Sequence, residues 1–317
     1  MGHVLVTTDY LGPGDAVDRI LTDAGHTVTY SPARGTRDDD ERLRLLADVD
    51  AAIVASEPVT AEMLAGAARL KVIARSGVGF DSVDTDAAQE LGIWVCNAPG
   101  VNHHSVAEMT MALMLTAAKH LDTVIPQVRQ GQWPRTAGTE LRGKTLGILG
   151  FGASGRAVAT LAAAFGMTVL VHTAHPDLQV SAVEYVELGA IQARSDYLSL
   201  HVKPTAENRN MVDGDFLAAM NPTAVVVNTA RGSLIDEAAL ATALESKSIG
   251  GAALDVVDRE PLTTDSPLAG RDDVVIVSHL AGQTEEARMR AGESAARQVL
   301  AVLGGRQPSA PVNAPKF

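Results

Sequence analysis

Short apolar segments rich in valine and isoleucine alternate along the chain with segments of helical periodicity, and this alternation constrains the fold more than any other feature. Strands that alternate with helices pair in parallel, because a parallel pair needs a long crossover connection, which a helix supplies. The sequence therefore predicts an α/β fold of doubly wound parallel sheets. The expected strands are residues 4–7, 27–30, 51–55, 72–75, 93–96, 145–149, 168–172, 197–201, 224–228, 251–255 and 274–278.

The strands fall into two groups, and the length of 317 residues also fits two domains of roughly 150 residues each. A helix expected at about 284–303 follows the last strand and could return to the first group. The predicted organisation is a substrate-binding domain of residues 1–98 plus 285–317, with a dinucleotide-binding domain of residues 99–284 inserted into it. We expect a cleft between the two.

A helix-rich segment links the two groups of strands. Ser105, with Glu108 three residues later, resembles a capping box and predicts a helix from Ser105 to about His120. Closely spaced large apolar side chains indicate that this helix packs on several sides, between domains or between subunits. They are Met109, Met111, Leu113, Met114 and Leu115.

Composition excludes several classes of function. The net charge of -12 and only 5 Phe, 2 Trp and 4 Tyr argue against a nucleic-acid partner. Cys96 is the only cysteine, so no internal disulfide forms, and its apolar surroundings predict a small buried side chain. No apolar run reaches the ~20 residues of a membrane span, and the start of the chain lacks the pattern of a signal peptide. We therefore expect a cytoplasmic protein with no membrane partner.

A glycine motif follows the strand expected at 145–149. Gly150, Gly152 and Gly155 have the spacing Gly-x-Gly-x-x-Gly, with Ala153 and Ser154 inside the motif, and the motif opens a helical segment expected at residues 156–165 that begins with Arg156. In this context the glycines allow a tight turn and a close approach of backbone to a pyrophosphate, which binds at the helix N-terminus. The motif predicts a Rossmann-type dinucleotide site, to which Arg156 could add positive charge.

The next strand ends without the carboxylate that usually binds the ribose hydroxyls of NAD. Thr173 stands there, flanked by His172 and His175, and the first aspartate is Asp177. Repulsion of a 2′-phosphate is therefore missing, and these three side chains could donate hydrogen bonds to one. The sequence leaves both NADP and NAD open as the cofactor.

Three polar residues follow later strands of the same group: Arg231, Glu260 and His279. Ligands of an open parallel sheet bind at the carboxyl ends of its strands, so these side chains are expected beside the nicotinamide. A histidine next to a carboxylate suits acid–base chemistry, and a planar guanidinium suits a carboxylate ligand. No metal site is predicted.

At these motifs the chain resembles the D-2-hydroxyacid dehydrogenase family, most closely its phosphoglycerate dehydrogenase-like branch. The resemblance covers nearly the whole chain and rests on residues 75–84, 150–156, 228–232, 253–261 and 278–282. It implies two Rossmann- or flavodoxin-like domains and an oxidoreductase that acts on D-2-hydroxy acids and 2-keto acids. It also implies a homodimer.

The resemblance assigns further roles. His279 would exchange the proton of the substrate hydroxyl, Glu260 would orient His279, and Arg231 would hold the substrate carboxylate. The backbone of Gly77, Val78 and Gly79 would bind that carboxylate as well, and Arg75 would contact a substrate phosphate. Cofactor contacts would come from Thr229, Ala230 and Asp255 at the nicotinamide amide, from His201 and Val202 at the adenosine, and from Gly282.

Two departures from the family bear on function. Thr173 replaces the usual aspartate, and the chain ends at Phe317 without the regulatory extension of longer phosphoglycerate dehydrogenases, so feedback through such a domain is not expected. The leading hypothesis is an NAD(P)-dependent 2-hydroxyacid dehydrogenase whose substrate could be phosphorylated. The alternatives are a biosynthetic dehydrogenase for a phosphonate or another unusual hydroxy acid, and a dinucleotide-sensing protein without turnover.

Overall fold

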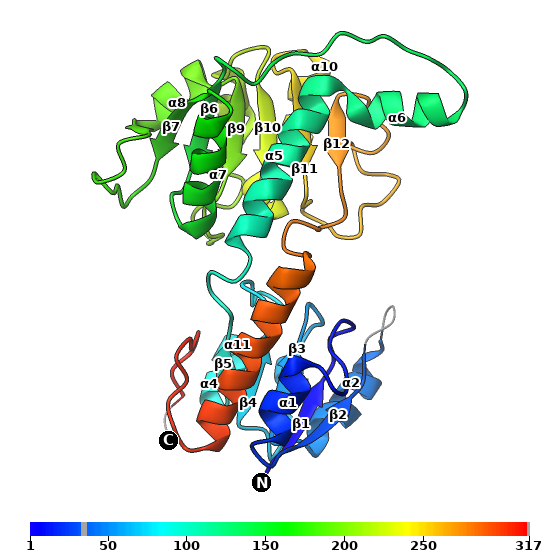
Figure 1. Ribbon diagram of the computed structural model, residues 1–317, viewed down its shortest axis with the longest axis vertical. Helices are drawn as coiled ribbons and strands as arrows, with labels where there is room; N and C mark the ends of the chain where they lie inside the picture. The colour runs from blue at the N-terminus through cyan, green and yellow to red at the C-terminus, as the bar shows by residue number, and fades with distance from the viewer. Residues whose placement is uncertain (33–36, 316–317) are drawn as a thin grey trace. The chain divides into compact units, whose positions relative to one another are not determined.

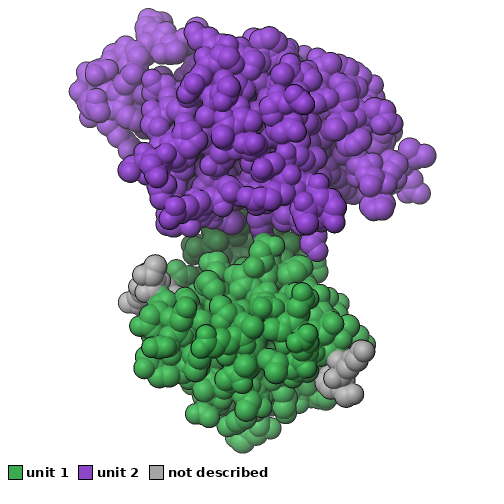
Figure 2. Space-filling view, turned by 180° about the vertical axis from the view of Figure 1, so that it is seen from behind, with its two compact units in different colours: residues 1–102, 282–317 green, residues 103–281 purple. Residues whose placement is uncertain are grey.

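The structure is a computed structural model that describes residues 1–32 and 37–315. The chain forms two compact units, residues 1–102 with 282–317 (unit 1) and residues 103–281 (unit 2), which Figure 2 colours separately. Each unit contains one parallel sheet flanked by helices (Figure 1), so the predicted fold class is confirmed.

Unit 1 contains a five-stranded sheet in the order β2-β1-β3-β4-β5, in which every pairing is parallel. The strands are β1 (His3–Val6), β2 (Thr27–Tyr30), β3 (Ala51–Val54), β4 (Val72–Arg75) and β5 (Trp94–Cys96). Alternate strand residues face opposite sides of a sheet, and here both sides are apolar. One side packs against α1 (Ala16–Thr22) and α11 (Glu285–Leu303), and the other against α2 (Asp39–Ala47), α3 (Ala61–Ala65) and α4 (Thr85–Glu90).

Unit 2 contains a seven-stranded parallel sheet in the order β12-β11-β10-β9-β6-β7-β8. Its strands are β6 (Thr145–Leu149), β7 (Thr168–His172), β8 (Glu184–Tyr185), β9 (Tyr197–Leu200), β10 (Val225–Asn228), β11 (Gly251–Leu254) and β12 (Val274–Ile276). One face packs against α5 (His103–Lys119) and α7 (Ala153–Ala164). The other packs against α8 (Leu188–Arg194), α9 (Gly214–Ala218) and α10 (Glu237–Glu245), while α6 (Leu121–Arg129) follows α5.

The predicted start of the long helix is wrong. Helix α5 begins at His103, and Ser105 lies inside it. The Ser105 hydroxyl does not cap the helix, because it donates a hydrogen bond to the carbonyl of Ala281 at 2.6 Å. A serine three residues before a glutamate thus resembled a capping box, although its partner is distant in the sequence.

Strand β8 was not predicted, because a strand of two residues is too short to show alternation. After α11 the chain reaches the edge strand β5, where Pro311 pairs with Cys96 in an antiparallel bridge. Cys96 itself is fully buried, as predicted, and burial raises the pKa of its thiol to about 12.

No helix in the part of the chain that the structure describes is long and apolar enough to cross a bilayer.

Candidate active site

The glycine loop joins β6 to α7 with backbone that only glycine fits. Gly150 has a φ of 90°, and a Cβ added there would lie 2.6 Å from the carbonyl oxygen of His201. A Cβ on Gly155 would lie 2.4 Å from the carbonyl oxygen of Gly150. The turn is therefore held tightly against both the start of α7 and the end of β9.

Gly152 differs, because a Cβ added there would meet nothing within 4 Å. Gly152 is the N-cap of the 12-residue helix α7 and provides no side-chain cap, and Ala153 and Ser154 form the first turn. The first N–H groups of a helix lack intrahelical acceptors and carry the positive end of its dipole. This end of α7 suits the pyrophosphate of a dinucleotide.

Arg156 has a defined position next to this loop. One guanidinium nitrogen donates to Asp177 at 2.8 Å, and the guanidinium carbon lies 4.7 Å from the centre of the Phe151 ring. Both members of the ion pair are about 40% exposed, which leaves Arg156 accessible to an anion. Asp177 therefore partly neutralises the charge that Arg156 could offer to a cofactor.

The end of β7 carries the residues expected at the ribose. Nδ1 of His172 lies 3.0 Å from the carbonyl oxygen of Val186, and the Thr173 hydroxyl accepts a hydrogen bond from the N–H of His175 at 3.3 Å. After β9, Nε2 of His201 lies 2.8 Å from the Ser199 hydroxyl, and burial lowers the pKa of His201 to about 4. His201 is therefore neutral at pH 7.

Unit 2 also contains a histidine–carboxylate pair. Nδ1 of His279 lies 2.8 Å from Oε2 of Glu260, and the two side chains are 46% and 38% exposed. Burial alone would raise the pKa of Glu260, but the hydrogen bond and charge of His279, the Val257 N–H and the charge of Arg231 outweigh burial. The pKa of Glu260 therefore lies below its usual range, and the carboxylate is ionised at neutral pH.

The loop that carries His279 is fixed by Asp255. The His279 N–H donates to the Asp255 carbonyl, and the two carboxylate oxygens accept the N–H groups of Leu280 at 2.6 Å and Ala281 at 3.0 Å. Asp255 is 1% exposed, and burial raises its pKa against the effect of these donors. Asp255 thus holds the loop that carries His279, and its contact with the nicotinamide amide stays a prediction.

Arg231 follows β10, and Asn228 shapes its loop. The Asn228 amide accepts the N–H of Ala230 at 3.0 Å and donates to the carbonyl of Arg231 at 2.8 Å. The Arg231 guanidinium donates to the Ala230 carbonyl at 2.7 Å, and Thr229 is buried with its hydroxyl 3.1 Å from that of Thr110. Asn228 lies in the motif of residues 228–232, but the sequence did not predict that its side chain holds the loop of Arg231.

The loop of residues 76–79 lies in unit 1, and its carbonyl groups and its N–H groups differ in their hydrogen bonding. All four carbonyl oxygens accept hydrogen bonds, whereas the N–H groups of Gly77, Val78 and Gly79 donate to no group in the part of the chain that the structure describes. Successive unpaired N–H groups form a concave site for an anion. This geometry supports the carboxylate site predicted for the loop.

Arg75 braces this loop from below. Its Nε donates to the Gly79 carbonyl at 2.9 Å, and one terminal nitrogen lies 3.3 Å from the Val54 carbonyl. Part of the Arg75 guanidinium is therefore engaged in hydrogen bonds within unit 1.

Gly282 also lies in unit 1, where an added Cβ would lie 2.8 Å from Nδ2 of Asn102. The other predicted cofactor residues, including Val202, lie in unit 2.

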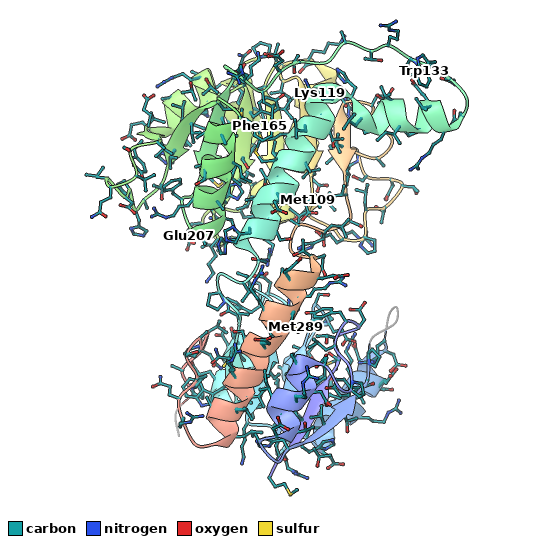
Figure 3. All side chains as sticks on the ribbon, in the orientation of Figure 1. Met109, Lys119, Trp133, Phe165, Glu207 and Met289 are labelled. Carbon is teal, nitrogen blue, oxygen red and sulfur yellow. The ribbon has the colours of Figure 1, made fainter. Side chains whose placement is uncertain are left out.

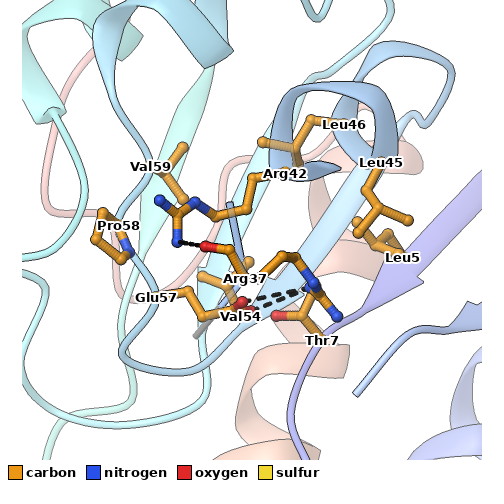
Figure 4. A pocket seen from close by; sticks show the side chains of 10 residues that line it. All are labelled: Leu5, Thr7, Arg37, Arg42, Leu45, Leu46, Val54, Glu57, Pro58 and Val59. Carbon is orange, nitrogen blue, oxygen red and sulfur yellow. Dashed lines mark hydrogen bonds and ion pairs between the residues drawn. The ribbon is translucent and has the colours of Figure 1, made fainter. Parts of the chain in front are cut away.

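A cavity of about 20 Å³ in unit 1 is too small to be the substrate site, because it has room for only about one water molecule. It lies between β1, β3 and α2, and Arg37 forms an ion pair there with Glu57 at 3.3 Å (Figure 4). No cluster of three or more metal-ligating side chains was found among the described residues.

Comparison with known proteins adds a family to this geometry. Residues 111–281 match the NAD-binding domain of D-isomer specific 2-hydroxyacid dehydrogenases. D-3-phosphoglycerate dehydrogenase of Mycobacterium tuberculosis is 41% identical over 84% of this chain, which corresponds to 52% of the relative. The chain thus spans about half the length of this relative.

Two further relatives match over most of their own length. Hydroxypyruvate reductase of Thermotoga maritima is 39% identical over 84% of this chain and 88% of the relative. The TT0316 protein of Thermus thermophilus, a solved structure, is 36% identical with a TM-score of 0.90, over 98% of this chain and 99% of the other.

Proposed function

Because the chain belongs to the D-isomer specific 2-hydroxyacid dehydrogenase family, we propose that it transfers a hydride between a nicotinamide cofactor and C2 of a D-2-hydroxy acid or 2-keto acid. The observation that carries the proposal is the pair of His279 and ionised Glu260, with Arg231 close enough to influence the pKa of that carboxylate. A protein that only sensed a dinucleotide would need no such pair.

The chemistry follows from the hydrogen bonds of the pair. A reduced nicotinamide, when bound in unit 2, would supply the hydride to C2. Since the Glu260 carboxylate engages Nδ1 of His279, Nε2 is the nitrogen that gives its proton to the C2 oxygen during reduction and takes it back during oxidation. Arg231 binds the substrate carboxylate and polarises the carbonyl, and ionised Glu260 stabilises the imidazolium.

We propose further that the enzyme accepts NADP. The support is the end of β7, where Thr173 and His175 stand and where no carboxylate occupies the position that repels a 2′-phosphate. The Michaelis constants for NADPH and NADH test this directly. A strong preference for NADH would contradict the NADP proposal without affecting the dehydrogenase proposal.

For the substrate we propose a small unphosphorylated 2-keto acid, as in the relative named hydroxypyruvate reductase. A phosphorylated substrate is the second candidate, which the 41% identity to a phosphoglycerate dehydrogenase favours. Arg75 donates to the Gly79 and Val54 carbonyls, and these two bonds use only part of the donors of its guanidinium.

A spectrophotometric screen tests the proposed function. Glyoxylate, hydroxypyruvate and its phosphorylated analogue would each be offered with NADH and with NADPH, and oxidation of the cofactor would be followed at its absorbance band. We expect turnover with at least one unphosphorylated 2-keto acid. Tight cofactor binding without turnover on any of them would favour the sensing protein instead.

We also propose that the chain acts as a homodimer. Helix α6 has no buried residue, and Leu121, Ile125 and Val128 lie on one face, each about 40% or more exposed. Trp133, which is 80% exposed, follows on the adjoining segment (Figure 3). A contiguous apolar surface of this kind is typical of a protein interface.

A cytoplasmic location also stays our proposal, supported by the single, buried cysteine.

A further inference from the structure

Each of the four carbonyl groups of the loop at residues 76–79 has a donor, and the donors come from three parts of unit 1. The Tyr10 hydroxyl donates to Ser76 at 3.0 Å, and the N–H of Ala98 donates to Gly77 at 2.9 Å. Nδ2 of Asn97 donates to Val78 at 2.7 Å, and Arg75 donates to Gly79. A peptide unit whose carbonyl is fixed on one side directs the N–H of the following residue to the other side. The Val78 carbonyl thus orients the N–H of Gly79.

Asn97 is itself held by the segment that follows α11. Its N–H donates to the Ala310 carbonyl at 3.2 Å. The buried side chain of Gln298, on α11, accepts the N–H groups of Ser309 at 2.8 Å and Ala310 at 3.3 Å and donates to the Ser309 hydroxyl at 2.9 Å. Asn97 therefore joins the anion-binding loop to the C-terminal segment of residues 309–314 within one unit.

The same segment is anchored at its other end by contacts that do not involve the loop. The Asn313 amide accepts the N–H of Val95 at 2.8 Å and donates to the Ile93 carbonyl at 2.9 Å, and the N–H of Ala314 donates to Gln89. The N–H of Val312 donates to the Val95 carbonyl. Asn313 thus stabilises the edge of the sheet, whereas Asn97 connects the segment to the Val78 carbonyl.

We propose that Asn97 is a positioning residue for the substrate carboxylate, and that the C-terminal segment holds Asn97 in place through Gln298. The inference rests on the proposed function, and on the predicted role of Gly77, Val78 and Gly79, which would bind the carboxylate together with Arg231. Asn97 fixes the Val78 peptide so that the N–H of Gly79 is aimed at the ligand before it binds. Binding then needs no reordering of the loop, which favours affinity for the keto acid over the rate of hydride transfer.

The variant Asn97→Asp tests the proposal, because it keeps the shape of the side chain but places an oxygen against the Val78 carbonyl. The Michaelis constant for the keto acid should rise about tenfold or more, while kcat and the constant for NADPH change little. Oxamate, an unreactive analogue of a 2-keto acid, should bind to the enzyme–NADPH complex with a similar loss of affinity in calorimetry. Gln298→Ala should act in the same direction but less strongly.

Asn313→Asp is the matched control, since it disturbs the same segment and edge strand without touching the loop. It should lower the Tm but leave the keto-acid constant unchanged. An unchanged constant and oxamate affinity in folded Asn97→Asp, or an equal rise in Asn313→Asp, would overturn the positioning role. A wild type that neither turns over a keto acid nor binds oxamate would refute the proposed function, and this inference with it.

Discussion

His279 adopts a backbone conformation that an L-residue rarely uses, with a φ of 58°. The left-handed region costs a residue with a Cβ roughly 1–2 kcal/mol, so the surrounding contacts must hold it there. Asp255 does so with three hydrogen bonds to residues 279–281. In this conformation Nδ1 of His279 lies 2.8 Å from Oε2 of Glu260.

The pair makes activity dependent on pH. The folded-state pKa of Glu260 is lowered, so the stability that the pair contributes is present above the ordinary carboxyl pKa and is lost as pH falls through the lowered value. Glu260→Gln removes the charge that stabilises the imidazolium. As the pH rises, we expect the rate of keto-acid reduction by this variant to begin its decline at a lower pH than in the wild type. At pH 8 its kcat should be about tenfold lower or more. A pH profile of kcat checks this, and superimposable profiles would contradict the role of Glu260.

Sequence reasoning singled out the polar residues that chemistry demands, but it missed the residues that hold them. Arg231, Glu260 and His279 each follow a strand of one parallel sheet, a pattern that is visible in the sequence. Asn97 and Tyr10 support the loop of unit 1 through side chain–to–backbone hydrogen bonds over 19 and 66 residues. No local pattern signals such contacts, because they depend on the packing of the completed unit.

At the scale of elements, the glycine loop contains glycines that are needed for two different reasons. Gly155 is required by the fold, since a Cβ would collide with backbone, whereas Gly152 opens onto empty space in which a pyrophosphate would lie. The spacing of the motif predicted both positions together. Why glycine is needed at each position becomes visible only when the surroundings of each residue are known.

Two alanine variants of the loop should therefore behave differently. Gly152→Ala should leave the Tm of the cofactor-free protein nearly unchanged but weaken NADPH binding about tenfold or more. Gly155→Ala should lower the Tm, because its Cβ lies 2.4 Å from the Gly150 carbonyl oxygen. Thermal unfolding and fluorescence titration with NADPH measure the two effects. Full NADPH affinity in Gly152→Ala would contradict a pyrophosphate site at this helix.

The errors in predicting elements have local causes. Strand β8 consists of two residues, and the start of α5 was assigned from a serine whose hydroxyl bonds to Ala281 instead of the helix. The other strands were predicted to within one or two residues, because most of them are continuous apolar runs that are buried on both faces. Periodicity thus identifies long buried elements and fails at short edges and helix ends.

At the scale of the whole molecule, the chain leaves its first sheet, builds unit 2 and returns as α11, which packs on β3 and β4 of unit 1. The return is visible in the sequence only as a helix without a following strand. The net charge of -12 belongs to the whole chain, while residues 77–79 and the start of α7 offer to anions N–H groups that have no acceptor among the described residues. Binding of acidic ligands by an acidic protein therefore depends on local backbone geometry.

The proposed homodimer gives a test at this scale. Ile125→Glu places a charge in the middle of the apolar face of α6, so it should convert the dimer to a monomer. Leu178→Glu is the control, since Leu178 is 84% exposed on a different loop of unit 2. Sedimentation velocity should give twice the chain mass for the wild type and the control. A dimeric Ile125→Glu variant, or a monomeric wild type, would contradict the α6 interface.

The proposed function requires His279 to move the substrate proton during hydride transfer, so His279→Ala should lose that step. The substrate found in the screen would be offered with saturating NADPH, and NADPH binding would be titrated separately. We expect kcat to fall ~100-fold or more while the Kd for NADPH stays the same. A variant that reduces the keto acid as fast as the wild type would contradict it.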